Sequence, residues 1–104
     1  MTGIIIIGRA IFVKDEDDSD ALTETYRAEV DLQHYRLKVD NTLTPPYYEV
    51  FREWKDGKRL LHERVFATSC RDTLLLCGLF CADNPKLVDV KPGDRGYGEL
   101  AATI

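Results

Sequence analysis

Apolar side chains run almost without interruption from Ile4 to Val13, and most of them are β-branched. An apolar run without polar alternation is typical of a strand that is covered on both faces. The pattern therefore predicts a strand at the centre of a sheet. The segment that follows, KDEDDSD at 14–20, combines closely spaced carboxylates with Ser and Asp, which favours an exposed loop.

Apolar and polar positions alternate strictly between Tyr26 and Asp40, but the alternation changes phase once. A fold-back at Gln33–His34 explains the change of phase and predicts a two-stranded hairpin. This register also places opposite charges across from each other on one face, each pair stabilising by about 0.2–1 kcal/mol. One long strand with a β-bulge is the alternative. The predicted charge pairs are Asp31 with Arg36, Glu29 with Lys38, and Arg27 with Asp40.

A second hairpin is predicted between Tyr47 and Phe66, because the Asp56-Gly57 pair is a strong signal for a two-residue turn. The turn gives this hairpin two faces of different composition. We assign the more apolar face to the core beneath a helix: Tyr48, Val50, Trp54, Leu61 and Val65. The opposite face mixes aromatic and charged side chains, which pair as Tyr47 with Phe66, Glu49 with Arg64, and Phe51 with His62.

The pattern becomes helical near residue 70. Ser69 and Asp72 form a capping-box pattern ahead of an apolar run rich in Leu and Cys, which predicts a helix over 70–82. A buried strand over the same residues is the alternative. Two further strands are predicted at 86–90 and 97–104. The expected fold class is α+β, an antiparallel sheet of about six or seven strands with one helix packed on one face.

Length and charge narrow the class of protein. The chain has 104 residues, which predicts a single domain over 1–104. The net charge of −4 equals the charge of segment 14–20 alone, so the remainder is neutral overall. No apolar stretch is long enough to cross a membrane, and the start of the chain lacks the basic region of a signal peptide. Together with an odd number of cysteines, these features predict a cytoplasmic protein with free thiols.

The three cysteines, Cys70, Cys77 and Cys81, lie close together in the predicted helix. On a helix they share one stripe with Leu74, which predicts packing in the core. Zinc sites draw four ligands from short turns, so we expect no metal site. Cys70, at the predicted helix N-terminus and beside Arg71, is the one cysteine with part of the environment of a reactive thiolate.

The acidic loop consists of Asp15, Glu16, Asp17, Asp18 and Asp20. It does not fit a calcium-binding loop that begins at Asp15, because Asp20 stands where glycine is needed and Tyr26 where a bidentate glutamate belongs. We expect a solvated loop. The alternatives are weak binding of a divalent cation and docking on a basic partner. No phosphate loop, nucleophile elbow or spaced carboxylate pair occurs, so we expect no cofactor and no enzyme. A catalytic site assembled across the fold is the alternative.

The stretch from Tyr47 to Phe80 resembles the strand, strand and helix of the small arm-type DNA-binding domains of phage integrases. The resemblance covers about a third of the chain and implies nucleic-acid binding through the 47–67 hairpin. Those domains read DNA from a basic sheet face, whereas Glu49, Glu53 and Glu63 interrupt the arginines of this hairpin. Nucleic-acid binding is therefore the second hypothesis.

By elimination, the sequence favours a small non-enzymatic protein-binding module, of the inhibitor, immunity or accessory-subunit type that phages and other mobile elements encode. The partner is expected to be another protein, and a homodimer is compatible with the sequence. We expect docking on the mixed face of the second hairpin because aromatic anchors among charges are typical of binding surfaces. The alternative is that the terminal strands cover this face. The predicted docking residues are Tyr47, Glu49, Phe51, His62, Arg64 and Phe66.

Overall fold

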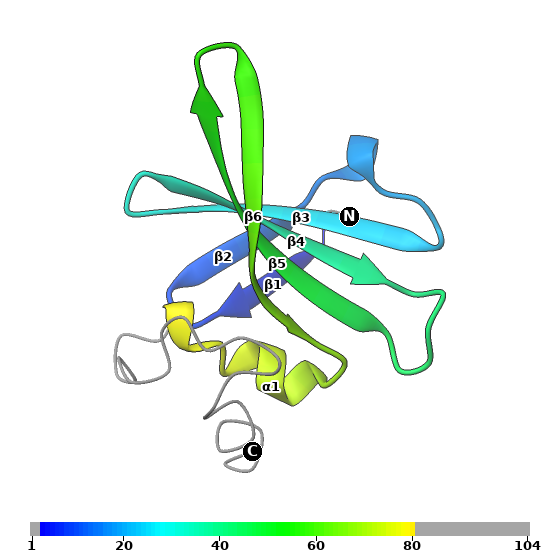
Figure 1. The fold of residues 1–104 in the computed structure, drawn as a ribbon. Helices are drawn as coiled ribbons and strands as arrows, with labels where there is room; N and C mark the ends of the chain where they lie inside the picture. Colours follow the sequence, from blue (N-terminus) through cyan, green and yellow to red (C-terminus); the bar gives the residue numbers. More distant parts are fainter. Residues whose placement is uncertain (1–2, 81–104) are drawn as a thin grey trace.

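Six strands form one antiparallel sheet in the computed structural model, which describes residues 3–80 (Figure 1). Each strand pairs with the next along the chain, so the sheet is a meander with β1 and β6 at its edges. The strands are β1 (Ile4–Ile7), β2 (Ala10–Lys14), β3 (Thr23–Val30), β4 (Gln33–Asp40), β5 (Tyr47–Asp56) and β6 (Arg59–Thr68). The helical elements are the 3-10 helix η1 (Glu16–Asp18), the α-helix α1 (Arg71–Leu75) and the 3-10 helix η2 (Gly78–Phe80). The predicted α+β class is confirmed.

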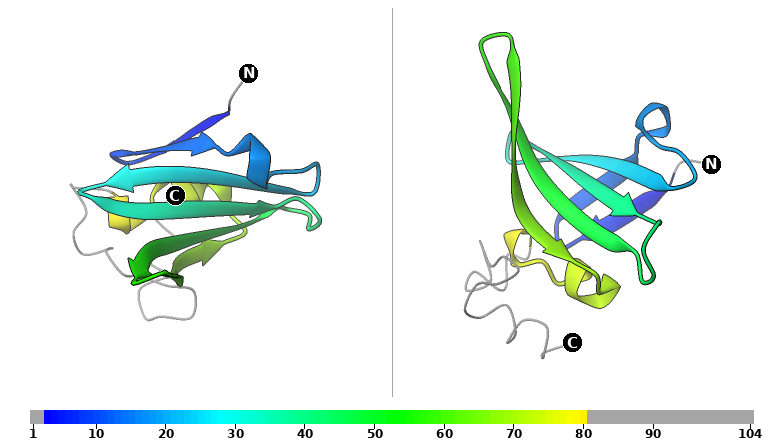
Figure 2. Two further views of the ribbon diagram at one scale, coloured as in Figure 1. Left: turned by 90° about the horizontal axis from the view of Figure 1, so that it is seen from above. Right: turned by 45° about the vertical axis from the view of Figure 1, so that its right-hand side comes forward.

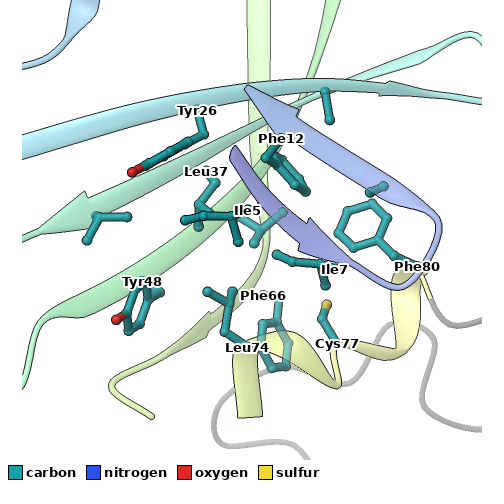
Figure 3. Close-up of a cluster of buried hydrophobic side chains, with 14 of the residues drawn as sticks. Ile5, Ile7, Phe12, Tyr26, Leu37, Tyr48, Phe66, Leu74, Cys77 and Phe80 are labelled. Carbon is teal, nitrogen blue, oxygen red and sulfur yellow. The ribbon is translucent and has the colours of Figure 1, made fainter. Parts of the chain in front are cut away.

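The hydrophobic core lies between the sheet and the segment that contains α1 and η2 (Figures 2 and 3). We call this side of the sheet the inner face and the opposite side the outer face. Alternate strand residues point inward, as the pleat requires. Phe80 closes one end of the core, with its ring edge-on to Phe12 at 5.5 Å and to Tyr35 at 5.0 Å between centroids. The most deeply buried members are Ile7, Phe12, Leu37, Val50, Phe66, Leu74, Cys77 and Phe80.

The first apolar run is a hairpin rather than the central strand that its composition predicted. It turns at Gly8, whose φ of 56° lies in the left-handed region that glycine adopts without strain, and continues as β2. Only the inward residues of β1 and β2 are buried, and β1 lies at the edge of the sheet. The prediction of a strand covered on both faces is therefore wrong within the described residues. The outward side chains Ile4, Ile6, Ile11 and Val13 are exposed.

The hairpin predicted between Tyr26 and Asp40 forms, and the alternative of one bulged strand is wrong. Its turn lies at Asp31 and Leu32, whose φ values of 51° and 67° are both positive. Ala28 therefore faces Tyr35, and the predicted charge pairs do not form, because Arg27 stands opposite Arg36. The register differs from the prediction by an even number of residues, so the side chains within β3 and β4 keep their predicted faces, whereas Leu32 lies in the turn and is 88% exposed.

The hairpin of β5 and β6 turns at Gly57 and Lys58, one residue later than predicted, with Gly57 at a φ of 63°. A β-bulge between Val50 and Phe51 then shifts the register near the base of the hairpin. Because a bulge adds one residue to one strand, every following side chain changes face. Phe66 therefore faces Val50 and is only 1% exposed, which corrects its predicted place on the docking face.

Residues 70–80 are helical in part, and the alternative of a buried strand is wrong. The helix α1 is shorter than predicted and its N-cap is Cys70, so the predicted capping box with Ser69 does not form. Cys70 is exposed whereas Leu74 and Cys77 are buried, so the predicted core stripe is wrong for Cys70 and correct for the other two. Cys81, the end of the predicted helix and the strands predicted at 86–90 and 97–104 lie outside the described residues.

Candidate functional site

The outer face brings together five of the six residues predicted for partner docking. Residues directly opposite in an antiparallel pair point to the same side of the sheet. Phe51 stands between Arg36 on β4 and Arg64 on β6, while Glu49 faces Lys38 and Tyr47 faces Asp40. Among residues 3–80, no helix or strand lies over these side chains, which form what we call the docking face. Its predicted members are Tyr47, Glu49, Phe51, His62 and Arg64.

Phe51 is the aromatic centre of the docking face. It is half-buried, because the guanidinium of Arg36 lies over its ring at 4.6 Å from the centroid. The His62 ring approaches edge-on, with 5.6 Å between centroids and an interplanar angle of 81°. A cation over an aromatic ring contributes about 0.5–1 kcal/mol at an exposed site. These contacts hold Phe51 in place and leave part of its ring exposed to solvent.

A network of ion pairs borders the aromatic centre. Glu53 has a side chain only 10% exposed, and its carboxylate lies 2.8 Å from Arg27 Nη1 and 3.5 Å from Arg36 Nε. Arg27 also contacts the acidic loop, at 2.9 Å from Asp15 Oδ2 and 3.2 Å from Asp18 Oδ2. The hydrogen bond from Arg27 lowers the pKa of the Asp15 carboxyl below its usual value. The network therefore ties the acidic loop with η1 to β3, β4 and β5 across the outer face.

The charges of the docking face are of both signs. Arg64 Nη1 lies 3.5 Å from Glu49 Oε2, and the arginines of the neighbouring strands are paired with Glu53 as described above. Exposed pairs of this kind contribute about 0–1 kcal/mol to stability, so their main effect is to set the pattern of charge. The face is therefore a mosaic rather than the basic surface that a nucleic-acid backbone prefers.

Sequence reasoning did not identify Arg27, Arg36 and Glu53 as members of this surface. Arg27 and Arg36 were assigned to other partners in the predicted hairpin of residues 26–40. Glu53 was recognised only as an acid within the second hairpin. These three side chains lie close together because β4 pairs with β5 in a register that places His34 opposite Glu53. The two strands belong to different hairpins, and neither segment contains a local signal for this register.

Two carboxylates of the acidic loop accept hydrogen bonds from nearby backbone N–H groups. Asp15 is the N-cap of η1 and accepts a hydrogen bond from the Asp17 N–H at 3.1 Å. Asp20 accepts from the N–H groups of Thr23 and Leu22, both at 2.8 Å, and these bonds lower the pKa of its carboxyl. Within residues 3–80, no group of three or more His, Cys, Asp or Glu side chains is arranged to hold a metal ion.

An open cleft of about 900 Å³ lies between the turn end of the β3–β4 hairpin and the turn end of the β5–β6 hairpin. Trp54 lines it and is 39% exposed, so the prediction that Trp54 packs in the core beneath the helix is wrong. The Arg52 guanidinium lies over the indole at 5.1 Å from the ring centroid and pairs with Glu63 at 3.0 Å. Both hairpins contribute apolar side chains, among them Leu32, Tyr35 and Leu60, and polar or charged ones, among them Gln33, His34 and Lys55.

Comparisons with known proteins add no relative. No family model matches the chain, and neither a curated protein nor a solved structure is significantly similar to it. None of the helices among residues 3–80 has the length and apolar character needed to span a membrane. Function must therefore be argued from the surfaces of this fold.

Proposed function

We propose that the chain is a small protein-binding module without chemistry of its own, and that it binds another protein through the docking face. The observation on which the proposal rests is a half-buried Phe51 on the part of the outer face over β5 and β6, which no helix or strand of residues 3–80 covers. The acidic loop and η1 lie against the β3 side of the same face, where they contact Arg27. A sheet needs only one buried face to be stable. Aromatic side chains on the second face are therefore available for intermolecular contact.

The composition of the docking face supports this proposal. Binding hot spots are enriched in Tyr, Trp and Arg, and they lie near the centre of an interface with polar groups around them. Here Phe51 and Tyr47 supply aromatic surface, Arg36 lies against the Phe51 ring, and Arg64 and Glu49 lie beside them. The ion pairs fix the arginine side chains before binding, which reduces the entropy lost when a complex forms.

The mixed charges favour a protein partner over a nucleic acid. A partner with a matching mosaic gains electrostatic complementarity, whereas a phosphate backbone would meet the carboxylates of Glu49 and Glu53. The exposed free thiol of Cys70 fits a reducing compartment, so we place this activity in the cytoplasm. Inhibitors, immunity proteins and accessory subunits are the kinds of binding module that we have in mind.

The test uses paired substitutions and a matched control. Tyr47→Ala and Phe51→Ala shorten aromatic side chains of the docking face, and Leu75→Ala shortens an exposed aliphatic side chain on α1, on the other side of the sheet. Each tagged protein is used for affinity capture from the native host, and captured proteins are identified by mass spectrometry. The leading candidate is then purified and its Kd measured by calorimetry with all variants.

We expect one protein to be captured by the wild type and by Leu75→Ala, with Kd raised at least about tenfold in both docking-face variants. Equal affinity for all four proteins would place the interface elsewhere and contradict the proposal. A gel shift on duplex DNA tests the nucleic-acid hypothesis, which requires binding that weakens steeply with salt. DNA binding that is lost in Phe51→Ala and Tyr47→Ala would assign the same face to nucleic acid instead.

A further inference from the structure

The outer edge of β1 has hydrogen-bonding groups that no strand among residues 3–80 uses. The Lys14 N–H donates to the Gly3 carbonyl at 2.8 Å, so these two residues form a hydrogen-bonded pair. Hydrogen-bonded and non-hydrogen-bonded pairs alternate along an antiparallel ladder. In the register of β1 with β2, Ile5 and Ile7 are therefore bonded to β2, whereas Ile4 and Ile6 direct their N–H and C=O groups away from it.

The same two residues expose their side chains. Ile4 is 59% and Ile6 is 60% exposed on the outer face, and Ile11 and Val13 extend the aliphatic patch onto β2. Proteins normally protect an edge strand by short length, lysine, proline or a bulge, because an open edge pairs with other chains. β1 is short, at four residues, but its sequence IIII contains no lysine, proline or bulge. Its edge therefore has the composition of an interface rather than of a protected edge.

We propose that β1 is a dimerisation edge, and that two copies of the chain pair their β1 strands antiparallel about a two-fold axis at Ile5. Around this axis Ile4 of each copy stands opposite Ile6 of the other. Because both residues direct their backbone groups outward, each of these two pairs exchanges N–H···O=C hydrogen bonds in both directions. The edge is thus complementary to itself, as an isologous interface requires.

The charges at the two ends of β1 favour this antiparallel arrangement. The turn end carries Arg9, whose side chain is 53% exposed and pairs with Asp31. The other end lies beside Lys14, after which β2 continues into Asp15 and Glu16 of the acidic loop. Antiparallel pairing brings Arg9 of each copy toward the acidic loop of the other. The interface is therefore complementary in charge as well as in hydrogen bonding.

The size of the contact sets the strength of the dimer. Exposed aliphatic patches of a few hundred Å² are smaller than the roughly 800 Å² per partner that stable complexes bury. We therefore expect a dimer with Kd in the micromolar range. Pairing extends the sheet across the axis, so the docking faces of both copies remain open on the same side. The dimer does not rest on the proposed function of that face.

Sedimentation velocity on the full chain, from about 5 to 500 µM, tests the proposal. Ile6→Pro removes an outward N–H that β2 does not use, and proline is tolerated on an edge strand. Ile6→Lys adds a charge to the same edge without changing the backbone. The matched control is Ile11→Lys, which changes a side chain of similar exposure on the same face but away from the edge. Circular dichroism confirms that each variant folds.

We expect a concentration-dependent monomer–dimer equilibrium for the wild type and Ile11→Lys, with association at least about tenfold weaker in both Ile6 variants. Arg9→Glu should weaken association and a second change, Glu16→Arg, should restore it. A wild type that stays monomeric over the whole concentration range overturns the proposal. So does a dimer that persists in both Ile6 variants, or one that Ile11→Lys weakens as much as they do, since the contact would then lie elsewhere or involve face stacking.

Discussion

Truncation of Phe66 and of Phe51 should have very different effects on stability. The β-bulge after Val50 places Phe66 in the core, where it is 1% exposed, and leaves Phe51 half-buried on the outer face. A large aromatic side chain that is fully buried removes roughly 150–200 Å² from water, which corresponds to about 4 kcal/mol. With the cavity that remains, Phe66→Ala should lower the free energy of unfolding by about 3–5 kcal/mol.

Phe51→Ala should cost less, because its ring already contacts solvent. The loss consists of about half the burial of a phenyl ring and of the cation–π contact with Arg36, together about 1–2 kcal/mol. Urea unfolding, followed by circular dichroism, measures both changes. A domain of this size has only about 5–15 kcal/mol of stability, so Phe66→Leu, expected to cost about 1 kcal/mol, serves as the milder variant.

The losses in the free energy of unfolding caused by Phe66→Ala and by Phe51→Ala together test the register of the β5–β6 hairpin. If Phe51→Ala destabilises the protein as much as Phe66→Ala does, or more, then the hairpin has no bulge at this position and Phe66 belongs on the outer face. Similar slopes of free energy against urea in all variants are needed for this comparison, because a changed slope reports a changed denatured or native state.

Three further predictions concern single sites. In a Cys81→Ser background, Ellman's reagent should titrate Cys70 rapidly in the native protein and Cys77 only after unfolding. Of these two cysteines Cys70 is the exposed one, and hydrogen bonding from Thr73 lowers the pKa of its thiol. Two fast thiols would contradict the buried position of Cys77. Leu32→Gly should raise the free energy of unfolding by about 0.5 kcal/mol. Relief of the positive φ at Leu32 contributes about 1–2 kcal/mol, which exceeds the entropy cost of glycine. A lower free energy of unfolding in this variant would contradict the turn geometry. Burial raises the pKa of Tyr26 to about 12, above the value of 10 expected when unfolded. The contribution of Tyr26 to stability should therefore be constant below pH 10 and fall between pH 10 and 12. Tyr26→Phe should flatten that fall in a series of urea titrations, and an unchanged slope would show that another group is responsible.

The face of each hairpin residue was more predictable than its register. In β3 and β4 the period of two places Tyr26, Ala28 and Leu37 on one face, and all three are buried, although the turn lies at Asp31 and not at Gln33. Predicted surface ion pairs pointed to the wrong register because each contributes at most about 1 kcal/mol. Arg27 instead reaches carboxylates on other elements, which alternation within one hairpin cannot indicate.

The positions of β1 and Phe66 could not be read from the sequence for a different physical reason. An apolar run predicts burial on both faces, yet Ile4 and Ile6 point to solvent among the described residues. The sequence indicates that the apolar side chains of a segment are to be buried, but it does not indicate whether the same chain or another chain buries them. The bulge after Val50 has no glycine to signal it, so the pattern alone continued the alternation and placed Phe66 outside.

One part of the docking face was predictable from the sequence and another part was not. Alternation along the second hairpin placed Phe51 and Arg64 on the same side, and the bulge left both there. Their cationic neighbour Arg36 arrives through the pairing of β4 with β5, and its guanidinium lies between the Phe51 ring and the carboxylate of Glu53. A guanidinium held on two sides loses little further freedom when a partner covers it. Strands, and not loops, therefore present the aromatic and charged groups, so the face proposed for docking is formed before any partner binds.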